Sequence, residues 1–493
     1  MTGILSAARI VPLVVLFALH AVAQRGRTLA VPKEYPTLTE ALLEASPGAV
    51  VLVDVGTWDV NTELESGITI RGKDMRKTVL RGKPSAPVII ATDADKAHLE
   101  NLTLEHPLTE KPQAKWPVIG IEGGSVTVSK CIIRNGHGPG VLISGAKHAL
   151  LDQVDVIGCA SAGVRIRGGK AEIKGGSVNL NQGYGIHAHE EAQVGITRTT
   201  LKSNGKSGVR SEGAKTAVTI TDVTSQLNEF GASCIAAGAI TVKDGRFEAS
   251  TKDGLYVRGP ESSFDIAGGV FNGNGGSGMS FTQGAGGKVT RATANGNRNS
   301  GLAAAHRDTR VTFHDNVAND NVGRGIFIQQ AASAVVTQNT CETNKATGIG
   351  VYDKGTVCRA ESNRCRENEK HGISYSREAR GEARGNVVAK NKMQGFGIFD
   401  KAQVTAQKNH CLENILNGIQ VWKGGRGILE RNVCDRNQQS GISISGAGSE
   451  ATFKRNKCRH NGFWGVSYEA GADRPEVGRD NELSKNKRGK TRR

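Results

Sequence analysis

Residues 437–444 read Asn-Gln-Gln-Ser-Gly-Ile-Ser-Ile, and this pattern decides the fold because it recurs along most of the chain. Each unit has an Asn, three residues, a Gly, an aliphatic residue, one further residue and another apolar residue. Of the fourteen intervals between successive repeat glycines, nine are 23 residues, four are 24 and one is 22. A fixed period of this length indicates a solenoid of stacked coils. The repeat glycines are residues 140, 163, 185, 208, 231, 254, 278, 301, 325, 348, 372, 395, 418, 441 and 465.

The repeat unit also indicates which kind of solenoid to expect. Apolar residues alternate with other residues, as in Gly325-Ile326-Phe327-Ile328. Alternation is the period of a strand, and no unit contains a ten-residue helical pattern. Short strands separated by turns of Asn and Gly favour a parallel β-helix. We expect about fifteen regular coils, each about 4.8 Å from the next.

Equivalent residues of successive coils should form ladders along the rod, and Asn occupies two of them. Stacked Asn amides hydrogen-bond to each other and to backbone at turns, so we interpret these residues as scaffold. The first ladder, four residues before the glycine, holds Asn at 181, 204, 274, 297, 321, 344, 368, 391, 414, 437 and 461. The second, nine residues before it, holds Asn at 316, 339, 363, 386, 409, 432 and 456.

Five of the nine cysteines fall on one further ladder, in which Val388 fills the remaining slot. A valine substitute indicates an apolar core position, where cysteine acts as a small hydrophobic residue. A metal site would need ligands that converge on one point, whereas a ladder spreads them along a line. We therefore expect neither a metal nor a cofactor. The five residues are Cys341, Cys365, Cys411, Cys434 and Cys458.

The N-terminus has the pattern of a secretory signal peptide over residues 1–23. Arg9 precedes an apolar run over residues 10–19, and Ala21-Val22-Ala23 is a small-x-small cleavage site. This run is too short to cross a bilayer, and no later stretch is apolar enough, so we expect no membrane span. The sequence predicts a secreted or periplasmic protein.

The rest of the chain divides into three further parts. Residues 24–122 should hold an N-terminal cap and irregular first coils, 123–475 the regular repeats, and 476–493 a basic tail. Within the first part, residues 36–43 are predicted to form one short helix, with Thr37 and Glu40 as a capping box. We expect this helix to cover the open N-terminal end of the rod, as solenoids require.

The first coils carry a resemblance to a known family. Tyr35-Pro36-Thr37-Leu38, Pro47-Gly48 before a strand, and Ile68-Thr69-Ile70-Arg71-Gly72 resemble the start of pectin-lyase-like β-helix proteins. The resemblance covers nearly the whole mature chain and implies an all-β fold, a right-handed parallel β-helix solenoid with a short N-terminal capping helix. That superfamily includes lyases, hydrolases, esterases, epimerases and non-catalytic proteins, so the resemblance implies carbohydrate as a partner without naming a reaction.

Signatures of individual enzymes of that superfamily are incomplete here. Gly136-His137-Gly138 and Arg165-Ile166-Arg167 are similar to motifs of polygalacturonases, whose catalytic Asp residues lie upstream of the His. No Asp occurs from 96 to 151, so we interpret this match as coincidence. The Asp-Pro-His motif of mannuronan epimerases is missing.

A basic strip is predicted on one outward face of the rod. The formal charge of +17 favours a polyanionic partner, or else a basic, solvated exterior. Positions two and four residues after the repeat glycine should face outward. Arg pairs well with carboxylates, and Arg or His could stabilise and remove the proton beside a uronate carboxylate. The alternative is an ordinary polar face. The strip comprises Arg165, Arg167, His187, His189, Arg210, Tyr256 and Arg258, with Arg165, His187 and His189 as catalytic candidates.

A second strip of charges lies five residues after the glycine in four consecutive coils. Asp353, Arg377, Asp400 and Lys423 alternate in sign, and Tyr352, Phe399 and Trp422 lie beside them. One interpretation is a ladder of charges that neutralise each other. The other is a sugar groove with aromatic platforms, in which Asp353 and Asp400, about 9.6 Å apart, form the acid pair of an inverting glycosidase.

Together these patterns lead to two functional hypotheses. The first is an exported β-helix protein that binds, and in its stronger form cleaves, an acidic polysaccharide, as a polysaccharide lyase or glycoside hydrolase. The second is a non-catalytic structural or adhesive rod outside the cytoplasm. Clefts are usually built from loops, and the coils after residue 123 have almost no insertions, which favours the rod. We do not expect nucleic acid as the partner. The sequence leaves the oligomeric state and the identity of the sugar open.

Overall fold

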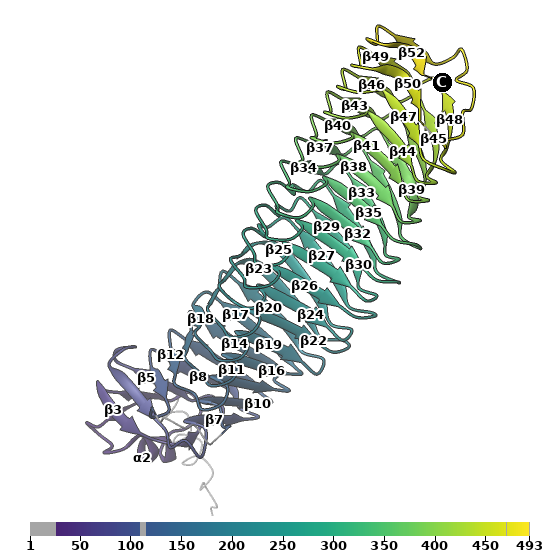
Figure 1. Cartoon of the computed structure of the whole chain (residues 1–493). Helices are drawn as coiled ribbons and strands as arrows, with labels where there is room; N and C mark the ends of the chain where they lie inside the picture. The colour runs from purple at the N-terminus through teal and green to yellow at the C-terminus, as the bar shows by residue number, and fades with distance from the viewer. Residues whose placement is uncertain (1–25, 109–114, 470, 493) are drawn as a thin grey trace, which may run out of the picture.

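The computed structural model describes residues 26–108, 115–469 and 471–492, so the signal peptide predicted over 1–23 lies outside the described residues. The chain forms a straight right-handed parallel β-solenoid of about 20 turns (Figure 1). The all-β prediction and the β-helix class are confirmed. Parallel pairing already begins with the first two strands, β1 (Thr28–Val31) and β2 (Val50–Val53), so the solenoid includes turns that precede the regular repeats.

Most coils contribute a strand to each of three parallel sheets that run along the rod, and from Arg246 to Thr340 isolated bridges continue the third sheet. Sheet 1 contains the strands that follow the repeat glycines, and sheets 2 and 3 form the other two faces. The strands β23 and β25 are long enough to belong to both sheet 2 and sheet 3.

The strands of sheet 1 are β4 (Thr62–Glu63), β7 (Ile89–Thr92), β10 (Ile119–Glu122), β13 (Val141–Ser144), β16 (Val164–Arg167), β19 (Ile186–His189), β22 (Val209–Glu212), β24 (Ala232–Ile235), β26 (Leu255–Arg258), β28 (Met279–Thr282), β30 (Leu302–Ala305), β32 (Ile326–Gln329), β35 (Ile349–Tyr352), β38 (Ile373–Ser376), β41 (Phe396–Phe399), β44 (Ile419–Trp422), β47 (Ile442–Ser445), β50 (Trp464–Tyr468) and β52 (Gly489–Arg492).

The strands of sheet 2 are β1 (Thr28–Val31), β2 (Val50–Val53), β5 (Thr69–Gly72), β8 (Asp95–Glu100), β11 (Ser125–Ser129), β14 (His148–Asp152), β17 (Lys170–Lys174), β20 (Gln193–Thr197), β23 (Ala217–Gln226), β25 (Ala239–Glu248), β27 (Ser263–Ala267), β29 (Gly286–Thr290), β31 (Arg310–His314), β33 (Ser333–Thr337), β36 (Val357–Glu361), β39 (Arg380–Arg384), β42 (Gln403–Gln407), β45 (Arg426–Glu430) and β48 (Glu450–Lys454).

The remaining strands, of sheet 3, are β3 (Gly56–Asp59), β6 (Thr78–Arg81), β9 (Thr103–Glu105), β12 (Ile132–Arg134), β15 (Asp155–Ile157), β18 (Ser177–Asn179), β21 (Thr200–Lys202), β34 (Thr340–Glu342), β37 (Arg364–Arg366), β40 (Val387–Ala389), β43 (His410–Leu412), β46 (Val433–Asp435), β49 (Lys457–Arg459) and β51 (Glu482–Ser484).

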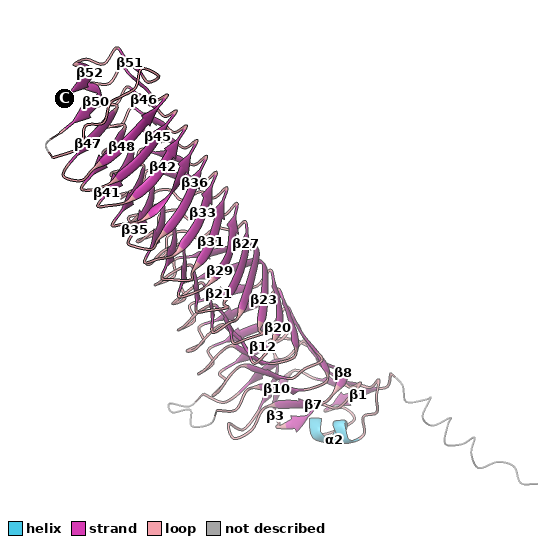
Figure 2. Cartoon of the chain, turned by 90° about the vertical axis from the view of Figure 1, so that its right-hand side faces the viewer, coloured by secondary structure: helices cyan, strands magenta, loops and turns pink. Residues whose placement is uncertain are grey.

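The predicted capping helix is present as α2 (Leu38–Leu43) at the N-terminal end of the rod (Figure 2). The Thr37 hydroxyl accepts a hydrogen bond from the Glu40 N–H at 3.2 Å, which is the expected capping interaction. Leu38 and Ala41 are buried, so the helix closes the end of the core. Among the described residues there is no helix of the length and apolar character that crossing a membrane requires.

The C-terminal end differs from the basic tail that we expected over 476–493. Strand β51 pairs with β49, and β52 pairs with β50, so this segment adds to the solenoid. This segment joins the solenoid because Asn481 and Asn486 continue the two Asn ladders. Their side-chain oxygens accept hydrogen bonds from the amides of Asn456 and Asn461. The spacing of 25 residues from the preceding coil concealed this continuation from the sequence pattern.

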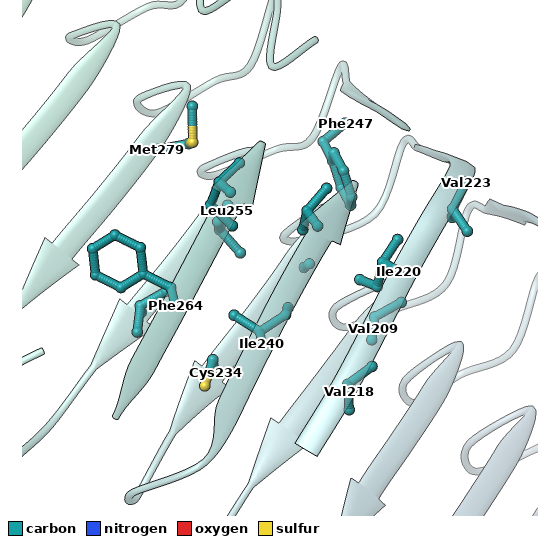
Figure 3. Packing of buried hydrophobic residues seen from close by; sticks show 14 of the residues in the cluster. Val209, Val218, Ile220, Val223, Cys234, Ile240, Phe247, Leu255, Phe264 and Met279 are labelled. Atoms are coloured by element: carbon teal, nitrogen blue, oxygen red, sulfur yellow. The ribbon is translucent and has the colours of Figure 1, made fainter. Parts of the chain in front are cut away.

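The core repeats from coil to coil, as the period predicts. Val218, Ile240 and Phe264 occupy the same slot of three successive coils, and all three are buried (Figure 3). Phe247 and Phe271 stack with ring centroids 4.9 Å apart and an interplanar angle of 6°. Equivalent inward positions of successive coils thus hold apolar side chains, whereas residue type varies more on the outer faces of the sheets.

Both Asn ladders are confirmed. Asn363 shows the pattern: its Oδ1 accepts the N–H and the amide of Asn339, at 2.9 and 3.0 Å. Its Nδ2 donates to the Val336 carbonyl and to Asn386 Oδ1, at 2.8 and 2.9 Å. Each buried amide is therefore satisfied by the coils on either side of it.

The cysteine ladder is likewise part of the core. Cys341 pairs in register with Cys365, and Val388 pairs with Cys411, as the pattern predicts. All nine thiols are buried and free. Burial raises the pKa of the Cys131, Cys159, Cys234 and Cys358 thiols to about 12, which suppresses the reactive thiolate.

We expect the cysteine ladder to stay reduced in the folded protein, because stacked strand positions hold Cβ atoms slightly farther apart than a disulfide prefers. Intact-mass measurement after alkylation without reduction should find thiols at Cys411, Cys434 and Cys458. A predominant Cys411–Cys434 or Cys434–Cys458 bridge would contradict this.

Candidate functional site

The structure places the first strip in register on the outer face of sheet 1. Arg165, on β16, pairs with His187 on β19, which pairs with Arg210 on β22. After Ser233 the same line continues to Tyr256. The neighbouring outward line carries Arg167, His189, Glu212, Ile235 and Arg258.

Two carboxylates that the sequence reasoning missed neutralise part of this strip. Glu212 accepts from His187 Nε2 at 3.0 Å and from Arg210 Nε at 3.3 Å. Glu190, in the turn after β19, lies 3.2 Å from Arg167 Nη2 and 3.1 Å from His189 Nδ1. Glu212 stands four residues after Gly208, so the same ladder rule would have found it.

Three nitrogen atoms of the first strip are buried without a hydrogen-bond partner: Arg165 Nε, His187 Nδ1 and His189 Nε2. Arg165 donates to the Ser161 hydroxyl at 3.0 Å and makes no ion pair within the described residues. The His187 ring lies 4.7 Å from that of Tyr184 and stacks on that of His189 at 4.6 Å. Buried polar atoms are normally satisfied, so this group can accept a polar ligand.

Burial lowers the pKa of His187 to about 4, and the bond to Glu212 opposes this only in part. Burial also lowers the pKa of His189, against the pull of Glu190. Burial resists ionisation of Glu212, but Arg210 and His187 outweigh it and bring its pKa below the usual range. With a pKa of about 4, His187 is neutral near pH 6.5, so at that pH it does not add to the positive charge of the strip.

The second strip lies in the turns that follow β35, β38, β41 and β44, where it borders a depression of about 530 Å³. Its carboxylates are already engaged. Asp353 lies 3.4 Å from Arg377 and accepts the Gln330 N–H at 3.3 Å, while Asp400 accepts the Ser376 hydroxyl at 2.7 Å. This supports the interpretation as a neutralising charge ladder over that of an acid pair.

The aromatic residues beside the second strip are mostly covered. Phe399 is 8 % exposed, and it folds over Gly397. Trp422 is 38 % exposed, but the Lys423 ammonium lies 4.1 Å from the centre of its ring. Of the three aromatic residues beside this strip, Trp422 is exposed, Tyr352 is half-buried and Phe399 is buried.

Sheet 2 has a groove of about 1010 Å³ over β36, β39, β42, β45 and β48 that the sequence reasoning did not find. Figure 2 shows most of these strands side by side near the C-terminal end. Its charges are mixed: Arg359 pairs with Glu361 at 2.8 Å, and Arg426 with Glu450 at 3.4 Å. This balance gives the groove no preference for a polyanion.

Comparison with known proteins agrees with this architecture. The family described as right-handed β-helix region matches residues 118–259, 218–364 and 347–491. The chain belongs to this family. A search of curated protein sequences found no match to this β-helix protein.

Solved structures similar to this β-helix protein include three carbohydrate-acting proteins. The catalytic unit of a thermostable GH87 α-1,3-glucanase from Streptomyces thermodiastaticus strain HF3-3 is 13 % identical, with a TM-score of 0.33, over 92 % of this chain and 73 % of that chain. The periplasmic alginate epimerase AlgG is 12 % identical, with a TM-score of 0.28, over 94 % and 85 %. The A-module of the mannuronan C-5 epimerase AlgE4 from Azotobacter vinelandii is 13 % identical, with a TM-score of 0.25, over 84 % and 93 %. At these values the similarity carries no functional argument.

No group of three or more His, Cys, Asp or Glu side chains within the described ranges of this β-helix is arranged to hold a metal ion. The acidic residues of the first strip are each engaged by Arg or His. The strip's own arginines, histidines and carboxylates can bind a charged ligand and transfer protons.

Proposed function

We propose that this protein is exported and binds an acidic polysaccharide on the outer face of sheet 1, where β16, β19 and β22 present the first strip. The observation that carries the proposal is the set of buried, unpartnered nitrogens on Arg165, His187 and His189. A carboxylate can accept hydrogen bonds from the Arg165 guanidinium, and the unpartnered nitrogens of His187 and His189 can accept hydrogen bonds from sugar hydroxyls, which would satisfy groups that the fold leaves unpaired.

Arg165 is the residue best suited to bind a carboxylate. Arg167 and Arg210 already have Glu190 and Glu212 as partners, whereas Arg165 has only a neutral hydroxyl. A guanidinium binds a carboxylate through two parallel hydrogen bonds, and the pair is stronger where water is partly excluded. Arg258, farther along the same face, donates to Gln283 at 2.7 Å and remains cationic for a second contact.

His187 gives this site the chemistry for cleavage by elimination. Its Nε2–H donates to Glu212, a tautomer that we assign from this bond, so Nδ1 carries a lone pair. With a pKa of about 4, the ring is a free base at neutral pH. If Arg165 holds the uronate carboxylate, Nδ1 can take the proton from the carbon beside it. The C4–O4 bond then breaks, a C4–C5 double bond forms, and the leaving oxygen takes a proton from solvent.

A non-catalytic rod is the second candidate, and the regularity of the coils favours it. The repeat glycines between 140 and 465 are 22 to 24 residues apart, so these coils contain no long loop that could enclose a substrate. Binding without cleavage would leave the role of Arg165 unchanged and would remove that of His187 as a base.

The binding proposal is tested with polygalacturonate, alginate and heparin at low salt. We expect the Arg165→Ala/Arg167→Ala variant to bind the preferred polymer at least about tenfold more weakly, because it loses charge-assisted hydrogen bonds. Lys485→Ala/Lys487→Ala removes the same charge at the end of the rod and should change affinity little. Added salt should weaken binding, since screening acts over about 10 Å at 0.1 M.

Equal losses in the two double variants would mean that net charge, and no site, does the binding. Failure of the unmodified protein to bind all three polymers would refute the proposal. Cleavage is followed separately, as ultraviolet absorbance of the unsaturated uronate product. His187→Gln should abolish the product and retain binding, whereas no product from the unmodified protein would favour the non-catalytic rod.

A further inference from the structure

Arg324 occupies a site on the outer face of sheet 1 that neither predicted strip includes. It precedes β32, and its guanidinium carbon lies 3.9 Å from the centre of the Phe327 ring and 4.7 Å from that of Tyr352. Stacking against two rings fixes the plane of a guanidinium while its terminal N–H groups can still donate at the edge. The side chain is thus held in one orientation by packing.

Gly350 makes room for this arrangement. A Cβ on Gly350 would lie 2.8 Å from Arg324 Cδ and 3.0 Å from Nε, closer than atoms of this kind approach. The φ of Gly350 is not in the left-handed region, so its backbone conformation does not require glycine. A larger residue at this position would displace the Arg324 side chain, which crosses Gly350 on the way to Tyr352.

The charge of Arg324 is not balanced by the protein. Within the described residues it makes no ion pair, and its Nε is buried without a hydrogen-bond partner. Arg165 has the same two properties, on the same face of the same sheet. A buried donor on an uncompensated cation favours an anion with a planar pair of oxygens, which is the geometry of a carboxylate.

We propose that Arg324, Phe327 and Tyr352 form a second anion-binding site that takes a carboxylate of the same polysaccharide chain that binds at Arg165. This inference rests on the proposed function. Seven strand pairings separate β16 from β32, so the two sites are about 34 Å apart at about 4.8 Å per strand. Figure 1 shows β16, β26, β30 and β32 following one another along the same side of the rod.

The two sites together favour long polysaccharide chains over short ones. An oligosaccharide of a few sugars reaches only one of them, whereas a long chain along the rod reaches both and also passes Arg258 on β26. When the second contact is intramolecular, the affinity of the long chain exceeds that of either site alone. The ligand class is therefore a long, linear polyuronate.

The test uses calorimetry with trigalacturonate and with polygalacturonate chains long enough to span both sites. We expect two trigalacturonate molecules per unmodified protein, and one for Arg165→Gln or Arg324→Gln. For polygalacturonate, each variant should bind about ten- to a hundredfold more weakly, the loss expected for one hydrogen bond between charged groups.

Two matched variants separate the site from charge and folding. Arg380→Gln removes the same charge from sheet 2, where Arg380 is exposed, and should change polygalacturonate affinity less than about twofold. Gly350→Ala keeps every charge, displaces the guanidinium, and should reproduce the loss seen in Arg324→Gln. Circular dichroism should show an unchanged β-sheet signal in all of these variants.

The outcomes distinguish the two proposals. One trigalacturonate per protein, lost in Arg165→Gln and kept in Arg324→Gln, would overturn the second site and leave the proposed function standing. Equal effects of Arg324→Gln and Arg380→Gln on polygalacturonate would also overturn it. If neither saccharide binds the unmodified protein, both proposals fall.

Discussion

Asn363→Ala is expected to destabilise the middle of the rod by about 4 kcal/mol or more. The substitution removes four buried side-chain hydrogen bonds and leaves the N–H of Asn339 and the carbonyl of Val336 without these partners. Each buried group that loses its partner costs about 1–3 kcal/mol, so the sum far exceeds that of an ordinary surface change. Thermal unfolding by circular dichroism, with hydrogen exchange of the neighbouring coils, measures it.

Asn299→Ala is the control for this experiment. Asn299 is exposed, and no side-chain hydrogen bond of it occurs within the described part of the chain. Its substitution should therefore leave the unfolding transition almost unchanged. If both variants unfold alike, the buried amide ladder contributes little to stability and its regularity needs another explanation.

Lowering the pH from 6.5 to 4 is expected to cost stability through two buried histidines. Burial lowers the pKa of His187 and of His371 to about 4, whereas an unfolded histidine titrates near 6.5. Because the folded pKa lies below the unfolded one, the unfolded chain binds more protons in this window. The contribution of these histidines to the free energy of unfolding is complete above pH 6.5. It decreases as the pH falls from 6.5 and is lost once the pH has fallen through 4, by at most about 3 kcal/mol per histidine.

The measurement is denaturant unfolding at several pH values for the unmodified protein and for His187→Gln/His371→Gln. The double variant should show a shallower loss between pH 6.5 and 4, and the difference isolates these two groups from the carboxylates. Parallel pH curves for the two proteins would show that both rings titrate as exposed histidines do.

Much of the fold follows from the period alone. Equal spacing fixes the register of the parallel pairs in the regular coils, so Cys341 aligns with Cys365, and Asn339 with Asn363, once the glycines are aligned. The C-terminal coil escaped because its spacing of 25 residues departs from the period, although Asn481 and Asn486 continue both ladders. A search for the Asn pairs without a fixed period would have found it.

The candidate sites could be predicted only in part. Outward positions follow from alternation, which placed Arg165, His187 and Arg210 on one line. Burial and hydrogen bonding of the individual side chains do not follow from alternation, so the low pKa of His187 was not foreseen. Arg324 was missed because its side chain reaches into the next coil, and Gly350 is no clear signal, since the same slot holds Gly397 two coils later.

The Asn ladders have a consequence for how the length of this protein can change in evolution. Asn363 bonds to Asn386 as Asn339 bonds to Asn363, so each coil presents the same surface to its successor that it receives from its predecessor. Duplication or loss of one complete coil would join like to like, and both ends of the rod would keep their own closing structures. Gain or loss of part of a coil, beyond the 22 to 25 residues that the present coils span, would break the amide chain. Rods of this kind should therefore lengthen by whole coils, which changes the reach of the outer face without altering the core.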